Sequence, residues 1–313
     1  MNSMKVLCLG TTPAVQRVMV FPRLALDAVN RAGTTQDGAA GKSVNVAKVL
    51  KALGEKPMAT GFLGGDRGEF LQRALTEKGV ESDFVTVSTQ TRQCITVIDE
   101  ATGTQTELVE ESRPVEAEAF DRLRAVIRRR LPEFRAMVMS GTIVTGGPVN
   151  LYFEYTQLAE NARVLSVVDG QGKALLGALP AKPGLVKPNR SELAATTGRE
   201  FKTDVDMMNA MRELFERGAQ RVVVTAGKEA TLAFDGKTFW SVTSPRIKAV
   251  NPIGSGDAFT AGLVSRLLRG YDLGEACRWG CAAGAANALT LMPGEVNKED
   301  VERLVKEIEV QKA

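Results

Sequence analysis

The stretch VNPIGSGDAFTAGL, residues 250–263, combines residue types that suit chemistry on an anion. In Gly254-Ser255-Gly256 the glycines allow backbone conformations closed to other residues, so successive N–H groups can face one concavity. The apolar run after Asp257 predicts a buried helix over 256–269, whose N-terminus favours negative charge. With an ordinary pKa of about 3.9, Asp257 would be ionised at pH 7 and could accept a hydroxyl proton. This combination suits phosphoryl transfer, although a simple helix cap explains the spacing equally well.

A second pair of residues suits a metal ion. Asn189 and Glu192 lie three positions apart in KPNRSEL (187–193), where a helix is predicted to begin. Glu192 could orient a Mg²⁺-bound water or bind the ion itself. A capping box, in which the two side chains satisfy each other's backbone amides, explains the same spacing equally well.

Several absences narrow the chemistry. The chain contains no histidine, which excludes Ser-His-Asp and Cys-His catalysis and any zinc site that needs imidazole. General-base work must therefore fall to Asp, Glu, Lys or Tyr. The chain has no GxxxxGK[ST] phosphate loop, and no GxGxxG follows the first predicted strand; GFLGGD (61–66) lacks the spacing. A P-loop enzyme and a nicotinamide-binding enzyme are therefore disfavoured.

Composition indicates an ordinary soluble globular protein. The 313 residues are 44% hydrophobic and 25% charged, with a formal net charge of +3. That charge is too small to indicate a nucleic acid or an anionic membrane as partner. The four cysteines show no CxxC spacing and are expected as buried free thiols. With no signal-peptide pattern and no 18-residue apolar run, we expect a cytoplasmic protein.

Short apolar runs alternate with helical patterns along most of the chain. This alternation predicts an α/β fold, a single domain over 1–313 with a mainly parallel central sheet between two helical layers. Ligands of such sheets bind beyond the carboxyl ends of the strands. The predicted strands are 4–10, 57–64, 136–141, 164–170, 184–189 and 221–227, and the predicted helices are 43–53, 67–79, 116–131, 148–161, 190–197, 204–217, 256–269, 273–291 and 297–310.

Two segments interrupt this alternation. Residues 14–37 and 92–110 read as partly polar strands without a crossover helix, and the second reads as a hairpin. We expect them to form a small β-sheet that stands off the main sheet as a lid. The alternative is that they are edge strands of the main sheet. After residue 257 the chain is predicted to be helical to its end.

Eight stretches, in order and at suitable spacing, resemble the PfkB (ribokinase-like) carbohydrate kinase family. Within it the chain is most similar to the branch of 1-phosphofructokinase and tagatose-6-phosphate kinase. The resemblance covers residues 12–263 and implies a ribokinase-like fold with ATP and Mg²⁺ as cofactors. The matching stretches are TPAVQRV (12–18), AAGKSVNVAKVLKALG (39–54), GFLGGDRGE (61–69), TRQCIT (91–96), SGT (140–142), VKPNRSEL (186–193), VTAGKEATL (224–232) and NPIGSGDAFTAGL (251–263).

The resemblance also implies roles for individual residues. Asp257 resembles the family's catalytic base, and the three residues before it resemble the anion hole. The metal contact of Glu192 would be indirect, through water. The residues implied to bind the nucleotide are Asn189, Glu192, Thr225, Gly227 and Lys187, and those implied to bind the sugar are Gln16, Arg31, Gly41, Lys42, Asn45, Arg92 and Ser140.

The residues themselves leave simpler interpretations open for three of these. Arg92 on the lid could grip a phosphate with two hydrogen bonds, or it could be a solvated charge on an edge strand. Lys42 could meet a phosphate at the start of a helix, or it could be a plain surface lysine. Asn45 could likewise be a solvated asparagine.

The chain departs from the family pattern on the sugar side. Gln16 stands where the family's NPAxD motif has an acid, and an amide both donates and accepts hydrogen bonds whereas a carboxylate only accepts. GGKG is replaced by Ala40-Gly41-Lys42-Ser43, which adds bulk where the backbone should approach the ligand. SGSLPxG is replaced by SGTIVTGGP, whereas the phosphoryl-transfer motifs are intact.

Together these observations predict an ATP-dependent kinase that phosphorylates a hydroxyl of a phosphorylated hexose. One alternative is a kinase of an unphosphorylated sugar or nucleoside, and another is a sugar-binding sensor without catalysis. Family members are often dimers, which implies a homodimer through the lid. Val18, Val20 and Phe21 are candidates for an apolar outer face of that lid.

Overall fold

The computed structural model describes residues 3–312. Its helices are α1 (Lys42–Ala52), α2 (Gly65–Glu77), α3 (Ala117–Arg130), α4 (Leu151–Asn161), α5 (Gly172–Ala178), α6 (Arg190–Thr197), α7 (Asp204–Glu216), α8 (Ser255–Leu267), α9 (Leu273–Ala288) and α10 (Lys298–Leu304). Its strands are β1 (Lys5–Gly10), β2 (Ala14–Phe21), β3 (Thr34–Ala40), β4 (Lys56–Leu63), β5 (Glu81–Ser82), β6 (Val85–Thr86), β7 (Arg92–Asp99), β8 (Thr104–Val109), β9 (Ala136–Ser140), β10 (Leu165–Asp169), β11 (Leu185–Val186), β12 (Val222–Val224), β13 (Thr231–Phe234), β14 (Phe239–Val242) and β15 (Val310–Lys312).

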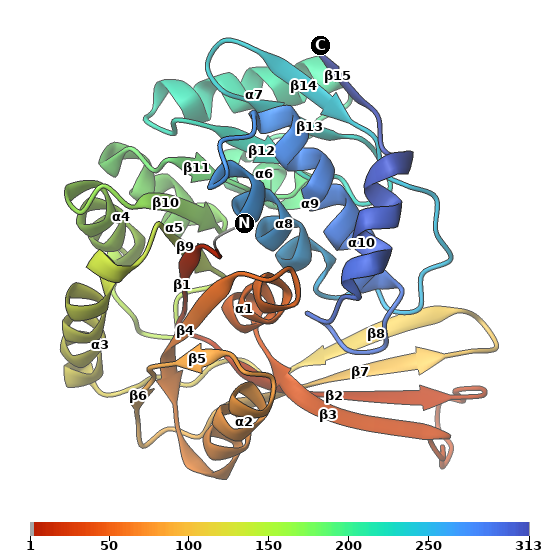
Figure 1. Cartoon of the computed structure of the whole chain (residues 1–313). Coiled ribbons are helices and arrows are strands. Elements are labelled where there is room, and N and C mark those ends of the chain that lie inside the picture. The colour runs from red at the N-terminus through yellow and green to blue at the C-terminus, as the bar shows by residue number, and fades with distance from the viewer. Residues whose placement is uncertain (1–2, 313) are drawn as a thin grey trace.

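An 11-stranded sheet runs through the middle of the molecule (Figure 1), in the order β15-β14-β13-β12-β11-β10-β9-β1-β4-β5, with β6 also paired to β4. The pairs from β5 to β12 are parallel, and β12 to β15 are antiparallel. Apolar side chains on one face pack against α1, α2, α8, α9 and α10. Those on the other face pack against α3 to α7. The predicted three-layer α/β/α architecture is thus confirmed.

The antiparallel edge of this sheet was outside the sequence prediction. The helical prediction for the end of the chain is wrong after residue 307, because a short 3₁₀ helix (Val305–Glu307) follows α10 and Val310–Lys312 then form β15, which pairs with β14. Strands β13 and β14 form a hairpin whose turn is fixed by the Asp235 carboxylate, which accepts hydrogen bonds from the amides of Lys237 and Thr238. Each of these strands has only 3 or 4 residues, too few to show a period.

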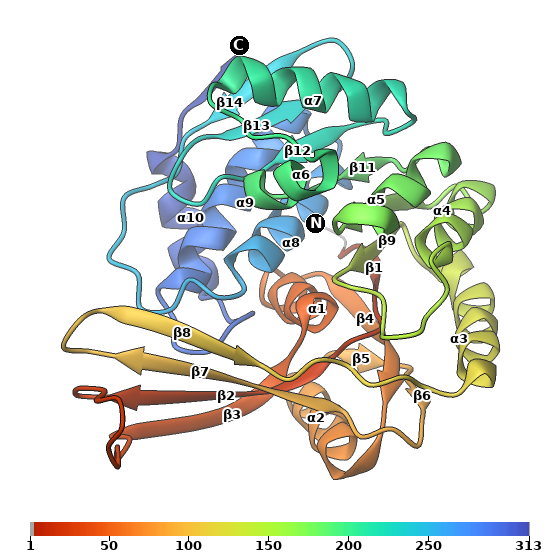
Figure 2. The same cartoon turned by 180° about the vertical axis from the view of Figure 1, so that it is seen from behind.

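The segments 14–37 and 92–110 form a separate four-stranded sheet in the order β3-β2-β7-β8. Figures 1 and 2 show it projecting from one side of the main body. The alternative of edge strands on the main sheet is therefore wrong. Val18 does not belong to an outer apolar face, because it is buried in a small cluster with Ile98 and Met292.

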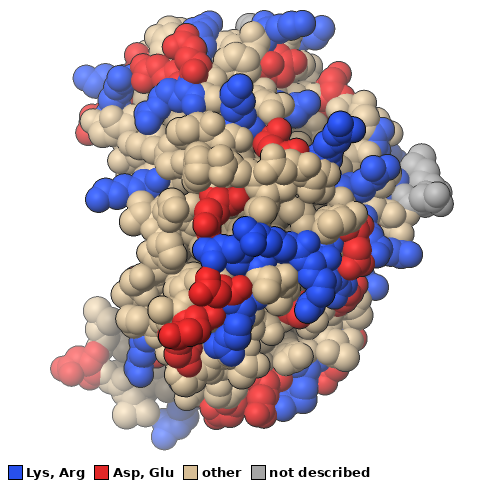
Figure 3. Space-filling view, turned by 90° about the vertical axis from the view of Figure 1, so that its left-hand side faces the viewer, with Lys and Arg blue, Asp and Glu red and all other residues tan. Residues whose placement is uncertain are grey.

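Charged residues on the surface are interleaved rather than gathered by sign. The run at the end of α3 forms ion pairs: Arg129 with Asp83, and Arg130 with Asp83, Glu81 and Glu133. Figure 3, which views this side of the molecule, shows basic and acidic side chains side by side. All four cysteines are buried free thiols, as expected. Among residues 3–312, no helix is both long and apolar enough to cross a membrane.

Candidate active site

Asp257 lies in the first turn of α8 and is buried. The helix is preceded by Gly254 with φ 82°, and a Cβ at this position would come within 2.8 Å of the Pro293 side chain, so only glycine fits. The Oδ2 atom of Asp257 accepts a 2.8 Å hydrogen bond from Nδ2 of Asn45 on α1. Since this carboxylate bonds to another helix rather than to the amides of its own, the helix-cap interpretation of Asp257 is wrong. Asn45 is buried, so the solvated interpretation of that residue is wrong too.

The environment of Asp257 changes its acidity. Burial raises the pKa of this carboxyl group to about 7, and the negative charge of Asp169 acts in the same direction. The positive charge of Lys42, the hydrogen bond from Asn45 and the charge of Lys187 oppose that rise. The sequence-based expectation of an ordinary pKa is therefore corrected. A base is most effective when its pKa lies near the working pH, so the shift suits catalysis.

Two of the four backbone amides of residues 254–257 donate hydrogen bonds within the loop, and the other two do not. The amide of Ser255 donates to the Pro252 carbonyl, and that of Asp257 donates to the Gly254 carbonyl. The amides of Gly254 and Gly256 donate to no residue in the described part of the chain. An anion at the start of α8 would therefore be held by the two glycine amides, with Ser255 shaping the loop.

Two buried asparagines, which the sequence reading missed, hold this loop in place. Asn251 accepts a hydrogen bond from the Ile253 amide and donates to the Leu291 carbonyl. Asn287 on α9 donates to the Ile253 carbonyl and accepts from the Gly294 amide at 2.7 Å. Asn251 stands inside the NPIGSGD motif and could have been singled out there, whereas nothing in the sequence marks Asn287.

A cluster of charges lies beside Asp257. The Nζ of Lys42, the first residue of α1, is 2.9 Å from Oε1 of Glu192 and 3.6 Å from Oδ1 of Asp169. The Nζ of Lys187 is 3.3 Å from Oδ2 of Asp169. The structure thus brings Lys42, Glu192 and Lys187 together around a carboxylate that the sequence reading missed. Its signal was present, because Asp169 ends a buried strand at the edge where ligands bind.

The charges in this cluster stabilise one another. Burial alone would raise the pKa of Asp169, but Lys187, Lys42 and a hydrogen bond from Thr260 hold it below its usual value. Burial alone would lower the pKa of Lys42, but Asp169, Asp257 and Glu192 raise it above its usual value. Lys42 is therefore a permanent cation and not a plain surface lysine.

Asn189 and Glu192 form a complete capping box at the start of α6. The Asn189 side chain accepts from the Glu192 amide, and Oε2 of Glu192 accepts from the Asn189 amide. The capping interpretation of this pair is thus confirmed. The other carboxylate oxygen of Glu192 faces Lys42, at the edge of the charge cluster.

A large cleft of about 1280 Å³ runs from the start of α8 along the carboxyl ends of β11 and β12. It contains five of the residues predicted to bind the nucleotide or the anion, together with apolar side chains suited to a flat ring. Thr225 is paired with Asn189 by a single parallel bridge, which fixes the two loops side by side. The predicted residues in its lining are Asn189, Thr225, Gly227, Ser255 and Gly256, and its apolar residues include Ala226, Ile247, Phe259, Ala285 and Ala288.

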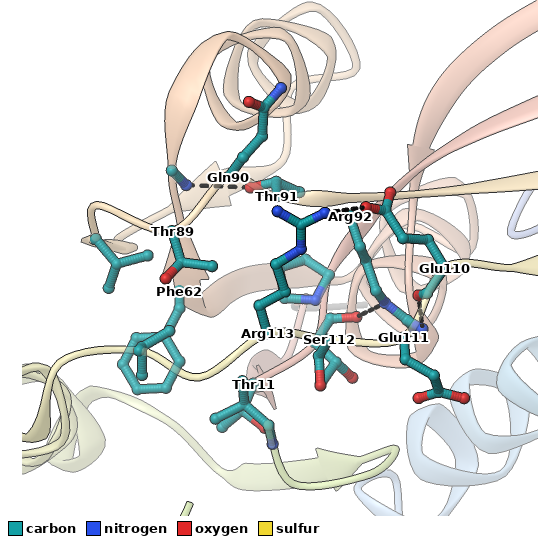
Figure 4. A pocket seen from close by; sticks show the side chains of 16 residues that line it. Thr11, Phe62, Thr89, Gln90, Thr91, Arg92, Glu110, Glu111, Ser112 and Arg113 are labelled. Atoms are coloured by element: carbon teal, nitrogen blue, oxygen red, sulfur yellow. Dashed lines mark hydrogen bonds and ion pairs between the residues drawn. The ribbon is translucent and has the colours of Figure 1, made fainter. Parts of the chain in front are cut away.

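Arg92 stands at the base of the four-stranded sheet. Its Nε donates to the Thr12 carbonyl and its Nη1 donates to the Glu110 carbonyl, each at 3.2 Å. Strand β7 lies between β2 and β8, so the edge-strand interpretation of Arg92 is wrong. Figure 4 shows the small pocket beside it, where Arg113 forms an ion pair with the Glu110 carboxylate.

Gln16 is buried in the same sheet, and its Nε2 donates to Oγ1 of Thr96 at 2.9 Å. Gly41, with φ 104°, separates β3 from α1, and a Cβ there would come within 2.8 Å of Pro13. Ser43 is buried against Gly10, so the bulk that it adds is not directed at a ligand. Ser140 ends β9, and its buried Oγ has no hydrogen-bond partner among the described residues.

Arg31 is the one predicted sugar residue that the structure does not bring near the others within this chain. It is exposed in the loop between β2 and β3. Ala14 pairs with Arg92 at one end of β2, whereas the loop that carries Arg31 begins after Phe21 at the other end and returns beside Val20. The strand from Ala14 to Val20 advances by six residues, which places Arg92 and the loop of Arg31 roughly 20 Å apart along the sheet.

Comparison with known proteins places this geometry in a family. Residues 3–298 match the description "pfkB family carbohydrate kinase". The chain belongs to the PfkB family. A curated PfkB-type relative, tagatose-6-phosphate kinase of Staphylococcus epidermidis, is 30% identical over 308 residues, covering 97% of this chain and 99% of the relative.

Solved structures agree with the PfkB assignment. Phosphofructokinase-2 of Escherichia coli in complex with fructose-6-phosphate has a TM-score of 0.86 and 27% identity, covering 98% of this chain and 99% of that one. A Thermotoga maritima protein described as a "possible 1-phosphofructokinase" has a TM-score of 0.91 and 25% identity, covering 99% of both chains. This PfkB protein is therefore a carbohydrate kinase with the fold that the sequence predicted.

Proposed function

We propose that this protein transfers the γ-phosphoryl group of ATP to a hydroxyl group of a phosphorylated hexose, with Asp257 as general base. The observation that carries the proposal is the position of Asp257. A buried carboxyl group with a pKa of about 7 lies directly beside the free amides of Gly254 and Gly256, at the end of a large cleft.

In the proposed reaction the sugar hydroxyl gives its proton to the Asp257 carboxylate. The oxygen of the sugar hydroxyl forms a bond to the γ-phosphorus, while the bond between that phosphorus and the bridging oxygen of ATP breaks. The amides of Gly254 and Gly256 stabilise charge on the phosphoryl oxygens, since N–H donors at a helix start favour an anion. Asn45 holds the carboxylate in position through its 2.8 Å hydrogen bond.

The side chain of Lys187 adds positive charge next to this anion-binding site. Its Nζ lies 3.9 Å from the position of a Cβ on Gly256, and the side chain is buried. A residue larger than glycine at position 256 would separate the phosphoryl group from this charge. Lys187 and Lys42 together supply positive charge that ATP phosphates can meet.

The charge cluster fits Mg²⁺ held through water and phosphate. No group of three acidic, cysteine or histidine residues suited to a metal cage occurs among residues 3–312. Mg²⁺ typically uses one or two carboxylates and several waters together with substrate phosphates. Oδ1 of Asp169 is buried without a hydrogen-bond donor among those residues, and Glu192 lies nearby. When bound there, the ion would neutralise phosphate charge.

Arg92 supports a phosphorylated sugar as the acceptor. Its guanidinium uses Nε and Nη1 for backbone carbonyls, which fixes the plane of the group at the base of the four-stranded sheet. A fixed guanidinium favours phosphate because it can donate two parallel hydrogen bonds. Relatives named as kinases of tagatose-6-phosphate and as phosphofructokinases point to the same class of substrate.

We also propose that the four-stranded sheet acts as a lid and as a contact surface for a second copy. Closing over the sugar would exclude water from the phosphoryl group. Phosphofructokinase-2 of Escherichia coli has a tetrameric inhibited form. Leu26 and Val29, in the loop that also carries Arg31, are 92% and 83% exposed. Burying such side chains between copies would be favourable.

The proposal is tested by measuring ADP release with ATP and Mg²⁺ across fructose 1-phosphate, fructose 6-phosphate, tagatose 6-phosphate and unphosphorylated sugars. We expect turnover of at least one sugar phosphate and little of any free sugar. Turnover of ribose or adenosine that survives Arg92→Ala would instead show a kinase of unphosphorylated acceptors. Binding of a sugar phosphate without ATP consumption would show a sensor.

A further inference from the structure

The four-stranded sheet presents one face to the catalytic loops. Val18 and Ile98 pack with Met292 on this face, and a Cβ on Gly38 would come within 2.7 Å of the Met292 side chain. Met292 precedes Pro293, which touches Gly254 at the start of α8. Because side chains alternate along a strand, this inner face is defined by every second residue of each strand.

On the inner face Gln16 cannot supply negative charge. Its amide donates to Oγ1 of Thr96 at 2.9 Å, and its carbonyl oxygen accepts no hydrogen bond from the described residues. The same nitrogen lies 3.5 Å from the Arg17 carbonyl oxygen, so both of its hydrogens are directed at the protein and the neutral carbonyl oxygen remains for a ligand. The inner face of the sheet therefore carries a neutral side chain at position 16.

A carboxylate is present two strands away. Glu107 on β8 pairs directly with Thr96 on β7, so its side chain stands on the inner face next to the Thr96 hydroxyl. Asp37 and Asp99 stand on the opposite face, Asp37 in an ion pair with Arg17. Among the paired residues of these four strands, Glu107 is therefore the one acidic residue on the inner face.

The surroundings of Glu107 suit a ligand rather than an internal partner. Its side chain is exposed, and no described residue forms an ion pair or a hydrogen bond with it. Although the residue as a whole is exposed, desolvation of its carboxyl group by nearby protein atoms raises the pKa, and the positive charge of Arg92 acts in the opposite direction. A carboxylate without a protein partner thus lies within the electrostatic reach of the guanidinium proposed to bind phosphate.

We infer that Glu107 is a specificity-determining residue that binds hydroxyl groups of the sugar whose phosphate Arg92 holds. The inference rests on the proposed function. An ionised carboxylate can accept hydrogen bonds from two neighbouring hydroxyls, and the oxygens of a phosphate can take donors from a guanidinium. The pair would therefore select a polyhydroxylated acceptor that carries a phosphate a few atoms from its hydroxyls.

Steady-state kinetics of Glu107→Gln test this role. We expect the KM for the preferred sugar phosphate to rise about tenfold, while kcat and the KM for ATP stay within twofold of the wild-type values. This pattern is the one expected for a binding contact that is equally strong in the ground state and the transition state. Glu107→Asp should recover part of the loss. Glu100→Gln, in the exposed turn between β7 and β8, is the matched control and should behave as wild type.

Deoxy analogues of the preferred sugar phosphate identify the hydroxyl that Glu107 contacts. The wild type should reject one of them strongly, because a site built to bind a hydroxyl is left with an unpaired polar group. Glu107→Gln should reject that analogue about tenfold less. Equal discrimination by the wild type and Glu107→Gln would overturn the inference.

Two further outcomes separate this inference from the proposed function. If the wild type phosphorylates a sugar phosphate but Glu107→Gln matches Glu100→Gln in every constant, the role of Glu107 is refuted and the proposed function stands. If the wild type turns over no sugar phosphate, the proposed function itself has failed. A lower melting temperature together with losses in kcat and in the KM for ATP would show a structural role instead and would also overturn the inference.

Discussion

The two ends of the site are built differently. At the transfer end, Asp257 and its two free amides are held by buried asparagines on three segments of the main body. At the sugar end, Gln16 and Arg92 belong to a sheet that projects from that body. In the proposed function the chemistry therefore sits on a frame braced by these asparagines, whereas sugar recognition sits on the projecting sheet. Of the departures from the family pattern, Gln16 lies on this sheet, whereas Ser43 on α1 and the loop after Ser140 belong to the main body.

Removing the base should produce the largest effect. Asp257→Asn should lower kcat by about a thousandfold, because general-base catalysis contributes roughly 10²- to 10⁴-fold. The KM for ATP should change little. Asp121→Asn, an exposed carboxylate on α3, is the control. A variant at position 257 that keeps more than a tenth of the wild-type kcat would show that the transfer end works without this base.

At the sugar end, Arg92→Ala should raise the KM for the sugar phosphate by roughly 10- to 100-fold, since hydrogen bonds to charged groups contribute about 1.5–3 kcal/mol. The KM for ATP should not change. Arg17→Ala removes an arginine from the outer face of the same sheet and should have no such effect. If both variants raised the KM equally, the loss would come from a disturbed sheet and the contrast between the two faces would fail.

The pH dependence of kcat/KM tests whether Lys42, at the junction between the four-stranded sheet and α1, controls the pKa of Asp257 at the transfer end. Asp257 must be ionised to act, so kcat/KM should rise with pH through a midpoint near 7. Lys42 lowers this pKa through its positive charge. Lys42→Met should therefore move the midpoint upward by about one unit, a tenfold loss on the acid side. Lys56→Met, an exposed lysine on β4, should leave the midpoint in place. A downward shift of the midpoint in Lys42→Met would contradict the proposed electrostatic effect of Lys42 on Asp257.

The smallest effect tests the rigidity of the frame. Asn287→Ala leaves the Ile253 carbonyl and the Gly294 amide without their partner, which should cost about 2 kcal/mol in the free energy of unfolding. Thermal or urea unfolding measures this cost, with Asn209→Ala on the surface of α7 as control. A variant with unchanged stability and unchanged kcat would show that the asparagine brace does not matter.

The sequence predicted the main sheet and the transfer motif well, because both depend on local signals. Buried parallel strands are continuous apolar runs, and a glycine loop before a helix has a fixed spacing. It could not predict the pKa of Asp257, which depends on burial by residues far along the chain. Nor could it choose between the capping and metal roles of Glu192, because a capping box leaves one carboxylate oxygen free.

The sugar end was harder to predict because its contacts are not local. Nothing in the sequence shows that Gln16 meets Thr96, 80 residues later, or that Glu107 stands on the same face. Likewise, Asp169 reaches Lys42 and Lys187 only because the carboxyl ends of the strands meet at one edge. Pairing between strands decides which polar residues share a face, and one sequence does not reveal that pairing.

Gly41 alone separates the last residue of β3 from the first residue of α1. The four-stranded sheet, proposed to bind the sugar, therefore continues almost directly into the helix that carries Lys42 and Asn45, two of the residues that tune the pKa of Asp257. Thermodynamic reciprocity then applies: if sugar binding at the sheet changes the proton affinity of Asp257, protonation of Asp257 must change the sugar affinity by the same factor. In that case sugar binding and protonation of Asp257 are thermodynamically coupled, and a measurement of either one reports on the other.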